Sequence, residues 1–82
     1  MATVGVRLFA AAREAAGRGE DTFEAVTLGD VLEHARAAYG ETFAAVLERS
    51  RVWVNGDEAP QGDATLLKSG DEVAVLPPVS GG

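Results

Sequence analysis

Residues 27–40, TLGDVLEHARAAYG, carry the pattern that decides the fold. Thr27 can accept a hydrogen bond from the free N–H groups at the start of a helix, and Asp30 follows three residues later, where a capping acid belongs. Gly40 is a suitable terminator. Between them, apolar side chains recur at the spacing of one buried helix face, namely Leu28, Val31, Leu32, Ala35, Ala38 and Tyr39. The segment therefore predicts an amphipathic helix that packs across a larger apolar surface.

Strand patterns flank this helix on both sides. Residues 3–9, TVGVRLF, alternate between apolar and other side chains, which is typical of a strand with one buried face. Residues 72–76, EVAVL, form the last predicted strand, which stops at Pro77. Residues 51–54, RVWV, form another strand that enters a turn at Asn55-Gly56, and residues 21–26, DTFEAV, form a weaker one.

Shorter elements complete the prediction. Alanine-rich residues 10–17 predict one or two helical turns ended by Gly17, and a further short helix begins near Phe43. Loops are expected at residues 60–63 and 68–71, with Leu66 and Leu67 anchoring the chain between them to the core. Strands at both ends and helices between them predict an α+β domain of the β-grasp type. In it the main helix crosses one face of a mixed sheet, and the first and last strands are parallel neighbours.

Composition limits what such a chain can do. Its 82 residues and 8.5 kDa allow one small domain, which we expect over residues 1–76, followed by a tail at residues 77–82. The absence of cysteine excludes thiolate metal sites and a cysteine nucleophile, and a single histidine excludes sites that need two. A net charge of -6 disfavours nucleic acid as a partner. The sequence contains no apolar stretch of about 18 residues, which is the length that predicts a membrane span. No secretory signal is recognisable either, so a cytoplasmic location is expected.

A catalytic site within the domain is not predicted. Asp30 and His34 lie four residues apart on one helix face, but nothing places Ser50 beside them, so a surface pair is the better interpretation. Neighbouring acids in the sequence point to opposite faces or into solvent, and no phosphate-binding glycine motif occurs. Trp53 is interpreted as a packing residue rather than a binding platform.

The tail is the informative segment. Pro77-Pro78 favours an extended backbone, so the tail is expected to leave the sheet as a stiff spacer. Val79 and Ser80 continue it, and Gly81-Gly82 would let another active site close around the backbone. The α-carboxylate of Gly82 is a poor electrophile when ionised. It needs activation, typically as an acyl-adenylate, and nothing in this chain can supply that step. An ATP-using partner is therefore expected, with no cofactor and no metal bound by the chain itself.

Three stretches carry a resemblance to a known family: VRLFAAAREAAG near the start, the VNG turn at 54–56, and an ending in which Leu67 precedes GDEVAVLPPVSGG. They resemble the small subunits of molybdopterin synthase, which are ubiquitin-like β-grasp sulfur carriers. The resemblance implies that a ubiquitin-activating-type enzyme adenylates Gly82 and that a desulfurase-type enzyme supplies sulfur for a thiocarboxylate. The tail would then enter the large synthase subunit and donate sulfur to precursor Z, the cyclic pyranopterin monophosphate, in molybdopterin biosynthesis.

The resemblance also implies a set of partner contacts. The chain would act as a non-catalytic subunit and co-substrate in a heterotetramer with the large subunit. Apolar side chains beside the tail would dock on the partners, with Phe9 and Leu76 at the matching positions. Leu66 is a looser match and is expected in either the core or the interface. The tail residues expected to contact the partner are Pro77, Pro78, Val79 and Ser80, with Gly81 and Gly82 at the reacting end.

Other functions stay open at this point. The chain could be a sulfur carrier for thiamine-thiazole or cysteine synthesis, which would use the same activation with a different acceptor. It could be a ubiquitin-like modifier joined through Gly82 to a target lysine. It could also be a plain interaction domain whose end is inert, in which case removing Gly81 and Gly82 would change nothing.

Overall fold

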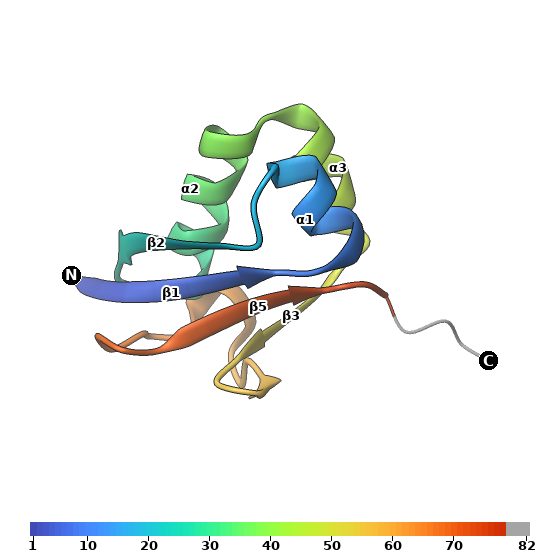
Figure 1. Cartoon of the computed structure of the whole chain (residues 1–82). Coiled ribbons are helices and arrows are strands. Elements are labelled where there is room, and N and C mark those ends of the chain that lie inside the picture. Colours follow the sequence, from blue (N-terminus) through green and yellow to red (C-terminus); the bar gives the residue numbers. More distant parts are fainter. Residues whose placement is uncertain (79–82) are drawn as a thin grey trace.

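The computed structural model describes residues 1–78 and consists of a single sheet with its helices on one side (Figure 1). Three helices are formed by Ala10–Ala16 (α1), Leu28–Tyr39 (α2) and Glu41–Glu48 (α3). Five strands are formed by Ala2–Leu8 (β1), Glu20–Ala25 (β2), Arg51–Val54 (β3), Asp57–Glu58 (β4) and Glu72–Leu76 (β5). A 3-10 helix, η1, covers Gly62–Ala64.

The sheet is mixed, with the strand order β2-β1-β5-β3-β4. The first and last strands lie side by side and parallel, with Gly5 opposite Glu72 and Leu8 opposite Val75. The other pairs are antiparallel. This arrangement confirms the predicted topology, in which both ends of the domain meet in the centre of one sheet.

Helix α2 forms as its sequence predicts. The Asp30 N–H donates to Thr27 Oγ1 at 3.2 Å, and the Thr27 N–H donates to Asp30 Oδ2 at 3.1 Å, which completes a capping box. The N–H groups of Thr27 and Val26, which both donate to Asp30 Oδ2, hold the pKa of Asp30 below its ordinary value. The buried stripe contains Leu28, Val31, Leu32 and Ala35. Ala38, predicted to join it, is exposed, because it lies at the border of the stripe.

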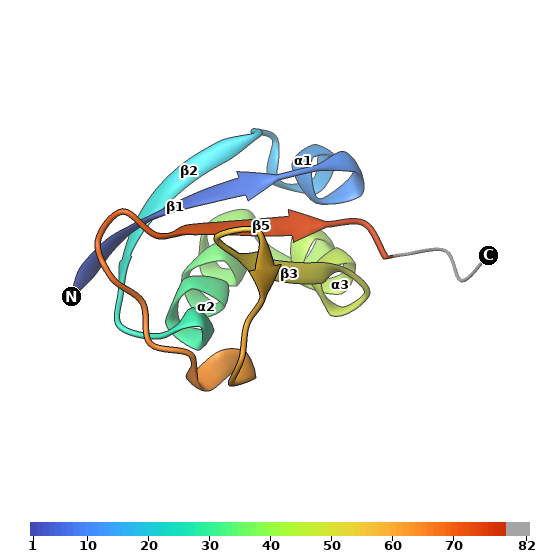
Figure 2. The same cartoon turned by 90° about the horizontal axis from the view of Figure 1, so that it is seen from below.

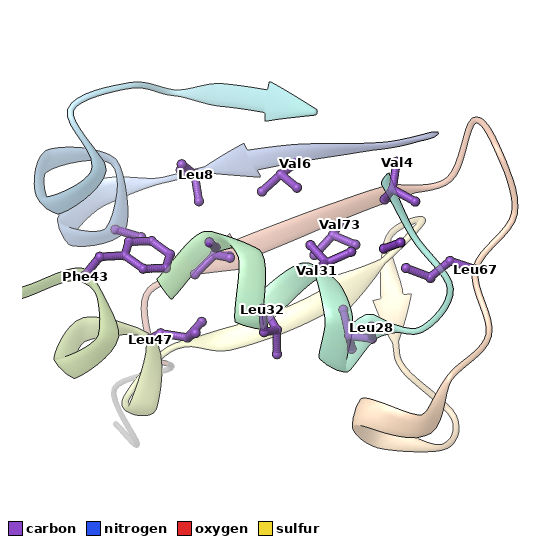
Figure 3. Close-up of a cluster of buried hydrophobic side chains, with 14 of the residues drawn as sticks. Val4, Val6, Leu8, Leu28, Val31, Leu32, Phe43, Leu47, Leu67 and Val73 are labelled. Carbon is purple, nitrogen blue, oxygen red and sulfur yellow. The ribbon is translucent and has the colours of Figure 1, made fainter. Parts of the chain in front are cut away.

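The core fills the space between the sheet and the helices (Figure 3). Alternate residues of β1 point into it, and those of β5 meet them from the neighbouring strand. Phe43 of α3 is fully buried, and its ring lies 5.0 Å from that of Tyr39 in an edge-on arrangement. The largest fully buried side chains are Val4, Val6, Leu8, Val31, Phe43, Val73 and Val75.

A tyrosine ties the end of α2 to the outer strand β2. The Tyr39 hydroxyl donates to Asp21 Oδ2 at 2.6 Å, and Arg18 pairs with the same carboxylate oxygen at 3.2 Å. The hydrogen bond from Tyr39 is the largest cause that lowers the pKa of Asp21. Burial, followed by the bond to Asp21, raises the pKa of Tyr39 well above its ordinary value. The contact therefore fixes the helix against the sheet edge with an ionised aspartate as acceptor.

The loop before β5 differs in part from its prediction. Leu67 is buried as expected, but Leu66 is 74% exposed and does not anchor the loop to the core. This stretch pairs with the entry to α2, since the Leu67 N–H donates to the Val26 carbonyl oxygen at 2.9 Å and Leu66 bridges Thr27. Because adjacent residues of an extended chain point in opposite directions, only one of the two leucines can face the core.

The turns around β3 and β5 are held by a side-chain network. Asn55 and Gly56 both have positive φ, as a tight turn after β3 requires. The Asn55 side chain donates to Asp71 Oδ1 at 3.0 Å and accepts from the Glu72 N–H at 2.9 Å. The Lys68 N–H donates to Asp71 Oδ2 at 2.7 Å and is the largest cause that lowers the pKa of Asp71. The network thus fixes where β5 begins.

Candidate functional site

The candidate site lies where β5 ends and the tail leaves the sheet. Strand β5 runs between β1 and β3 and ends at Leu76, and Pro77 and Pro78 follow without regular structure. Figure 2 looks onto the face of the sheet that the helices leave uncovered, with β1, β5 and β3 side by side near the end of the described chain. A protein that receives the tail would meet this part of the sheet first.

Phe9 and Leu76 lie next to each other at this end of the sheet. The Phe9 N–H donates to the Val75 carbonyl oxygen at 3.1 Å, which extends the parallel pairing of β1 and β5 by one residue. The backbone at Phe9 is still extended, and Leu8 and Val75 point into the core. Because strand side chains alternate, Phe9 and Leu76 point to the uncovered face. Phe9 is 41% exposed, and Leu76 is half-buried.

A second row of side chains lies on the same face, beside Phe9 and Leu76 and further from the tail. In it Ala74 of β5 stands opposite Arg7 of β1 on one side and Trp53 of β3 on the other. Trp53 and Ala74 are both half-buried. We use the name tail-root surface for Phe9, Trp53, Ala74 and Leu76, which form a mainly apolar area on the uncovered face.

Two ion pairs border the tail-root surface. Arg7 Nε lies 3.2 Å from Glu72 Oε1, and Arg51 Nη1 lies 3.3 Å from Glu58 Oε1. All four side chains are about half exposed or more, so each pair contributes little to stability. Both arginines have acidic partners, and the centre of the tail-root surface, formed by Ala74 and Leu76, presents hydrocarbon rather than charge.

The first tail residues lie against the helices. Pro77 and Pro78 border a cavity of about 170 Å³ between α1 and α3, together with Ala11, Ala12, Val46, Arg49 and Ser50. A wider groove of about 490 Å³ runs along β3 and also reaches Pro78. Neither hollow contains a catalytic grouping, and within residues 1–78 no cluster of three or more His, Asp or Glu could hold a metal ion. The chemistry of this region is therefore that of a surface beside a tail.

The structure separates Leu66 from the other predicted contacts. Leu66 bridges Thr27, which follows β2, and the end of β2 pairs with the start of β1. Phe9 follows the other end of β1, so Leu66 lies at the opposite end of the sheet from the tail. Pro77 and Pro78 are exposed. The predictions for Val79, Ser80, Gly81 and Gly82 fall outside the described residues.

The possible catalytic set considered from the sequence has other roles. Asp30 caps α2. The ring of His34 stacks on Phe23 at a centroid distance of 5.9 Å. The Ser50 hydroxyl donates to the Val46 carbonyl oxygen at 2.7 Å. Each polar group thus has a local structural contact, and the geometry does not join them into a nucleophilic site.

Trp53 is interpreted from the sequence as a packing residue, and the structure places it half-buried in the second row of the uncovered face. Strict alternation in RVWV already puts Arg51 and Trp53 on one face and the two valines on the other. Without the register of β3 against β5, the sequence could not show that this face adjoins the tail.

Comparison with known proteins fits this geometry. Residues 6–82 match the ThiS family. The chain belongs to the ThiS family. The match includes the tail as well as nearly all of the domain. The α+β, ubiquitin-like β-grasp fold and the resemblance to sulfur carriers of this type are therefore confirmed at the level of the family. No helix within the described part of this ThiS-family chain is long and apolar enough to cross a membrane.

Individual relatives of the ThiS-family chain carry different functional names. The molybdopterin synthase sulfur carrier subunit of Chlamydomonas reinhardtii is 39% identical over 83 residues, covering 94% of this chain and 95% of the relative. The small archaeal modifier protein 1 of Methanosarcina acetivorans is 35% identical with a TM-score of 0.88, covering 100% and 98%. A chain of the Helicobacter pylori molybdopterin-converting factor, solved as a complex of subunits 1 and 2, is 28% identical with a TM-score of 0.68, covering 98% and 99%.

Proposed function

We propose that this ThiS-family chain carries sulfur on Gly82 for molybdopterin biosynthesis. The observation that carries the proposal is the family match through residue 82 over a sequence that reads Pro77-Pro78-Val79-Ser80-Gly81-Gly82. The 39% identical relative that is a molybdopterin synthase sulfur carrier subunit supports this choice of pathway. The acceptor of the sulfur would be precursor Z, the cyclic pyranopterin monophosphate.

The proposed chemistry requires partners. The Gly82 carboxylate attacks the α-phosphate of ATP on a ubiquitin-activating-type enzyme, and pyrophosphate leaves. The outer sulfur of a persulfide on a desulfurase-type enzyme then attacks the acyl carbon, and AMP leaves. A thiol of the sulfur-supplying system cleaves the S–S bond of the resulting acyl disulfide, which releases the thiocarboxylate and leaves a disulfide on that system. The chain has no cysteine to act in this exchange, and the hollows of its described part show no catalytic grouping. It therefore acts as a co-substrate rather than as the catalyst.

The tail-root surface supports docking on the large synthase subunit. Phe9 and Leu76 offer apolar area where the tail leaves the sheet, and an enzyme that draws in the tail must approach this area. A similar chain of the molybdopterin-converting factor from Helicobacter pylori was solved in a complex of subunits 1 and 2. We propose that this chain also assembles with a large subunit, and that the assembly is a heterotetramer.

A second function has its own support. The Methanosarcina acetivorans relative is named a modifier protein, and it is 35% identical over the whole chain. A modifier would use the same adenylate, but the amine of a target lysine would displace AMP to form an isopeptide bond. Sulfur carriers for thiamine-thiazole or cysteine synthesis differ from the main proposal only in the acceptor.

The test is reconstitution with the adenylating enzyme, a sulfur donor, the large synthase subunit and precursor Z. The full chain should yield molybdopterin. Deleting Gly82, or adding one residue after it, should abolish the product while the circular dichroism spectrum and melting temperature stay unchanged. Product formation by either variant would refute the proposal. Lysine adducts in a cell extract, without sulfur transfer, would favour the modifier function.

A further inference from the structure

Trp53 occupies a distinctive position on the tail-root surface. It stands opposite Ala74, whose side chain is a single methyl group, and it borders the groove that runs along β3. It lies one row from Leu76, since Leu76 pairs with Arg51 two residues earlier in β3. Rows two residues apart are about 7 Å from each other and neighbouring strands are about 4.8 Å apart. The backbone of Trp53 is thus about 8 Å from that of Leu76.

The side of the indole that a partner could reach is hydrocarbon. Trp53 is half-buried, and its Nε1 is shielded from solvent. Among residues 1–78 this nitrogen has no hydrogen-bond acceptor. The one polar atom of the side chain is therefore covered, and any part of the ring that a partner reaches is carbon. A partner would gain apolar area from it without needing to offer an acceptor.

The size of a stable interface brings Trp53 inside it. A specific protein complex buries about 800 Å² on each partner, which is a patch about 30 Å across. A patch of this size centred on the end of β5 extends well beyond the 8 Å that separates Trp53 from Leu76. Fully desolvated tryptophans near the centre of an interface are among the residues that contribute most to affinity.

We propose that Trp53 is an anchor residue for the enzyme that receives the tail, and that it binds an apolar patch of that enzyme through the carbon atoms of its indole. The inference rests on the proposed function, because it takes the large synthase subunit as the partner. It goes beyond that function by naming a residue that sets affinity for the partner but takes no part in the chemistry.

Two variants separate apolar contact from hydrogen bonding. Trp53→Ala should weaken binding to the large synthase subunit at least tenfold, whereas Trp53→Phe should keep the dissociation constant within about threefold, because no indole N–H bond is lost. Isothermal titration calorimetry would measure both. Val26→Ala is a matched control, since Val26 is exposed but lies beside Leu66 at the far end of the sheet. It should bind like the unchanged chain.

A label on the unchanged chain gives a second readout. Trp53 is its only tryptophan, so 5-fluorotryptophan gives one ¹⁹F resonance that an unlabelled partner does not contribute to. That resonance should shift when the complex forms, whether or not the Trp53→Ala variant folds. The inference would be overturned by an unshifted resonance, or by a loss of affinity in Trp53→Phe as large as that in Trp53→Ala. If variants of Phe9 and Leu76 also bound the large synthase subunit with unchanged affinity, the whole proposed docking surface would be refuted.

Discussion

Replacing Phe9 by alanine tests the tail-root surface directly. Phe9 is 41% exposed in the free chain, and a phenylalanine side chain presents roughly 200 Å². About 80 Å² of apolar surface is thus available for a partner to cover. At about 25 cal/mol per Å², covering it is worth about 2 kcal/mol, so Phe9→Ala should raise the dissociation constant for the large synthase subunit about 30-fold.

The assay is calorimetric titration of the large subunit with each chain at one salt concentration. Val26→Ala is a suitable control, because Val26 is 46% exposed but lies at the other end of the sheet. The buried part of Phe9 also supports the domain, so the melting temperature of each free chain must be measured alongside. If a folded Phe9→Ala chain binds as tightly as the Val26→Ala chain, the tail-root surface is not where the partner docks.

Three further predictions follow from other contacts. Leu76→Glu should weaken binding to the large subunit more than tenfold, because the interface would bury an unpaired charge. Equal affinity of the two chains in titration would show that Leu76 does not contact the partner. Tyr39→Phe should lower the free energy of unfolding by about 1 kcal/mol, measured in urea, because it removes the bond to Asp21; an unchanged midpoint would contradict that role. Asp21, Asp30 and Asp71 have lowered pKa values in the folded state, so their stabilisation is present above pH 3.8 and is lost as pH falls through the folded values. Acid titration followed by circular dichroism should show this loss of stability, and Asp71→Asn should make the unfolding curve less steep. A curve identical to that of the unchanged chain would contradict the stabilising role of ionised Asp71.

The local elements could be predicted because each has a local cause. The capping residues and apolar spacing of α2 lie within one segment, and the alternation in β1 and β5 is a property of each strand alone. Asn55 and Gly56 predicted their turn for the same reason. Strand β4 could not be found this way, because Asp57–Glu58 is two charged residues paired only after that turn.

The errors concern which side a residue faces. Ala38 follows the spacing of the buried stripe, but at about 100° per residue it falls at the border of the stripe, where the sheet no longer covers it. Leu66 and Leu67 are equally apolar, and only the pairing of this stretch with the entry to α2 decides which one is buried. The place of Trp53 beside the tail has a similar non-local cause, since it depends on how β3 lies against β5.

The candidate site also has a part that could be predicted locally and a part that depends on strand register. Phe9 and Leu76 could be named from the sequence through a family resemblance, and the parallel register then brought them together. The register could not have been derived from the two strands alone, because they are more than sixty residues apart in the chain. The chemistry assigned to Gly82 rests on the sequence and on the ThiS-family match.

The central claim is that Gly82 carries sulfur, and intact-mass spectrometry tests it most directly. The full chain would be incubated with the adenylating enzyme, ATP and the sulfur donor, and then fragmented to locate any change. The expected result is a mass increase equal to the exchange of one oxygen for one sulfur, confined to Gly82 and absent without ATP. An adenylate that forms at Gly82 but never exchanges oxygen for sulfur, or that ends only on lysine amines, would contradict it.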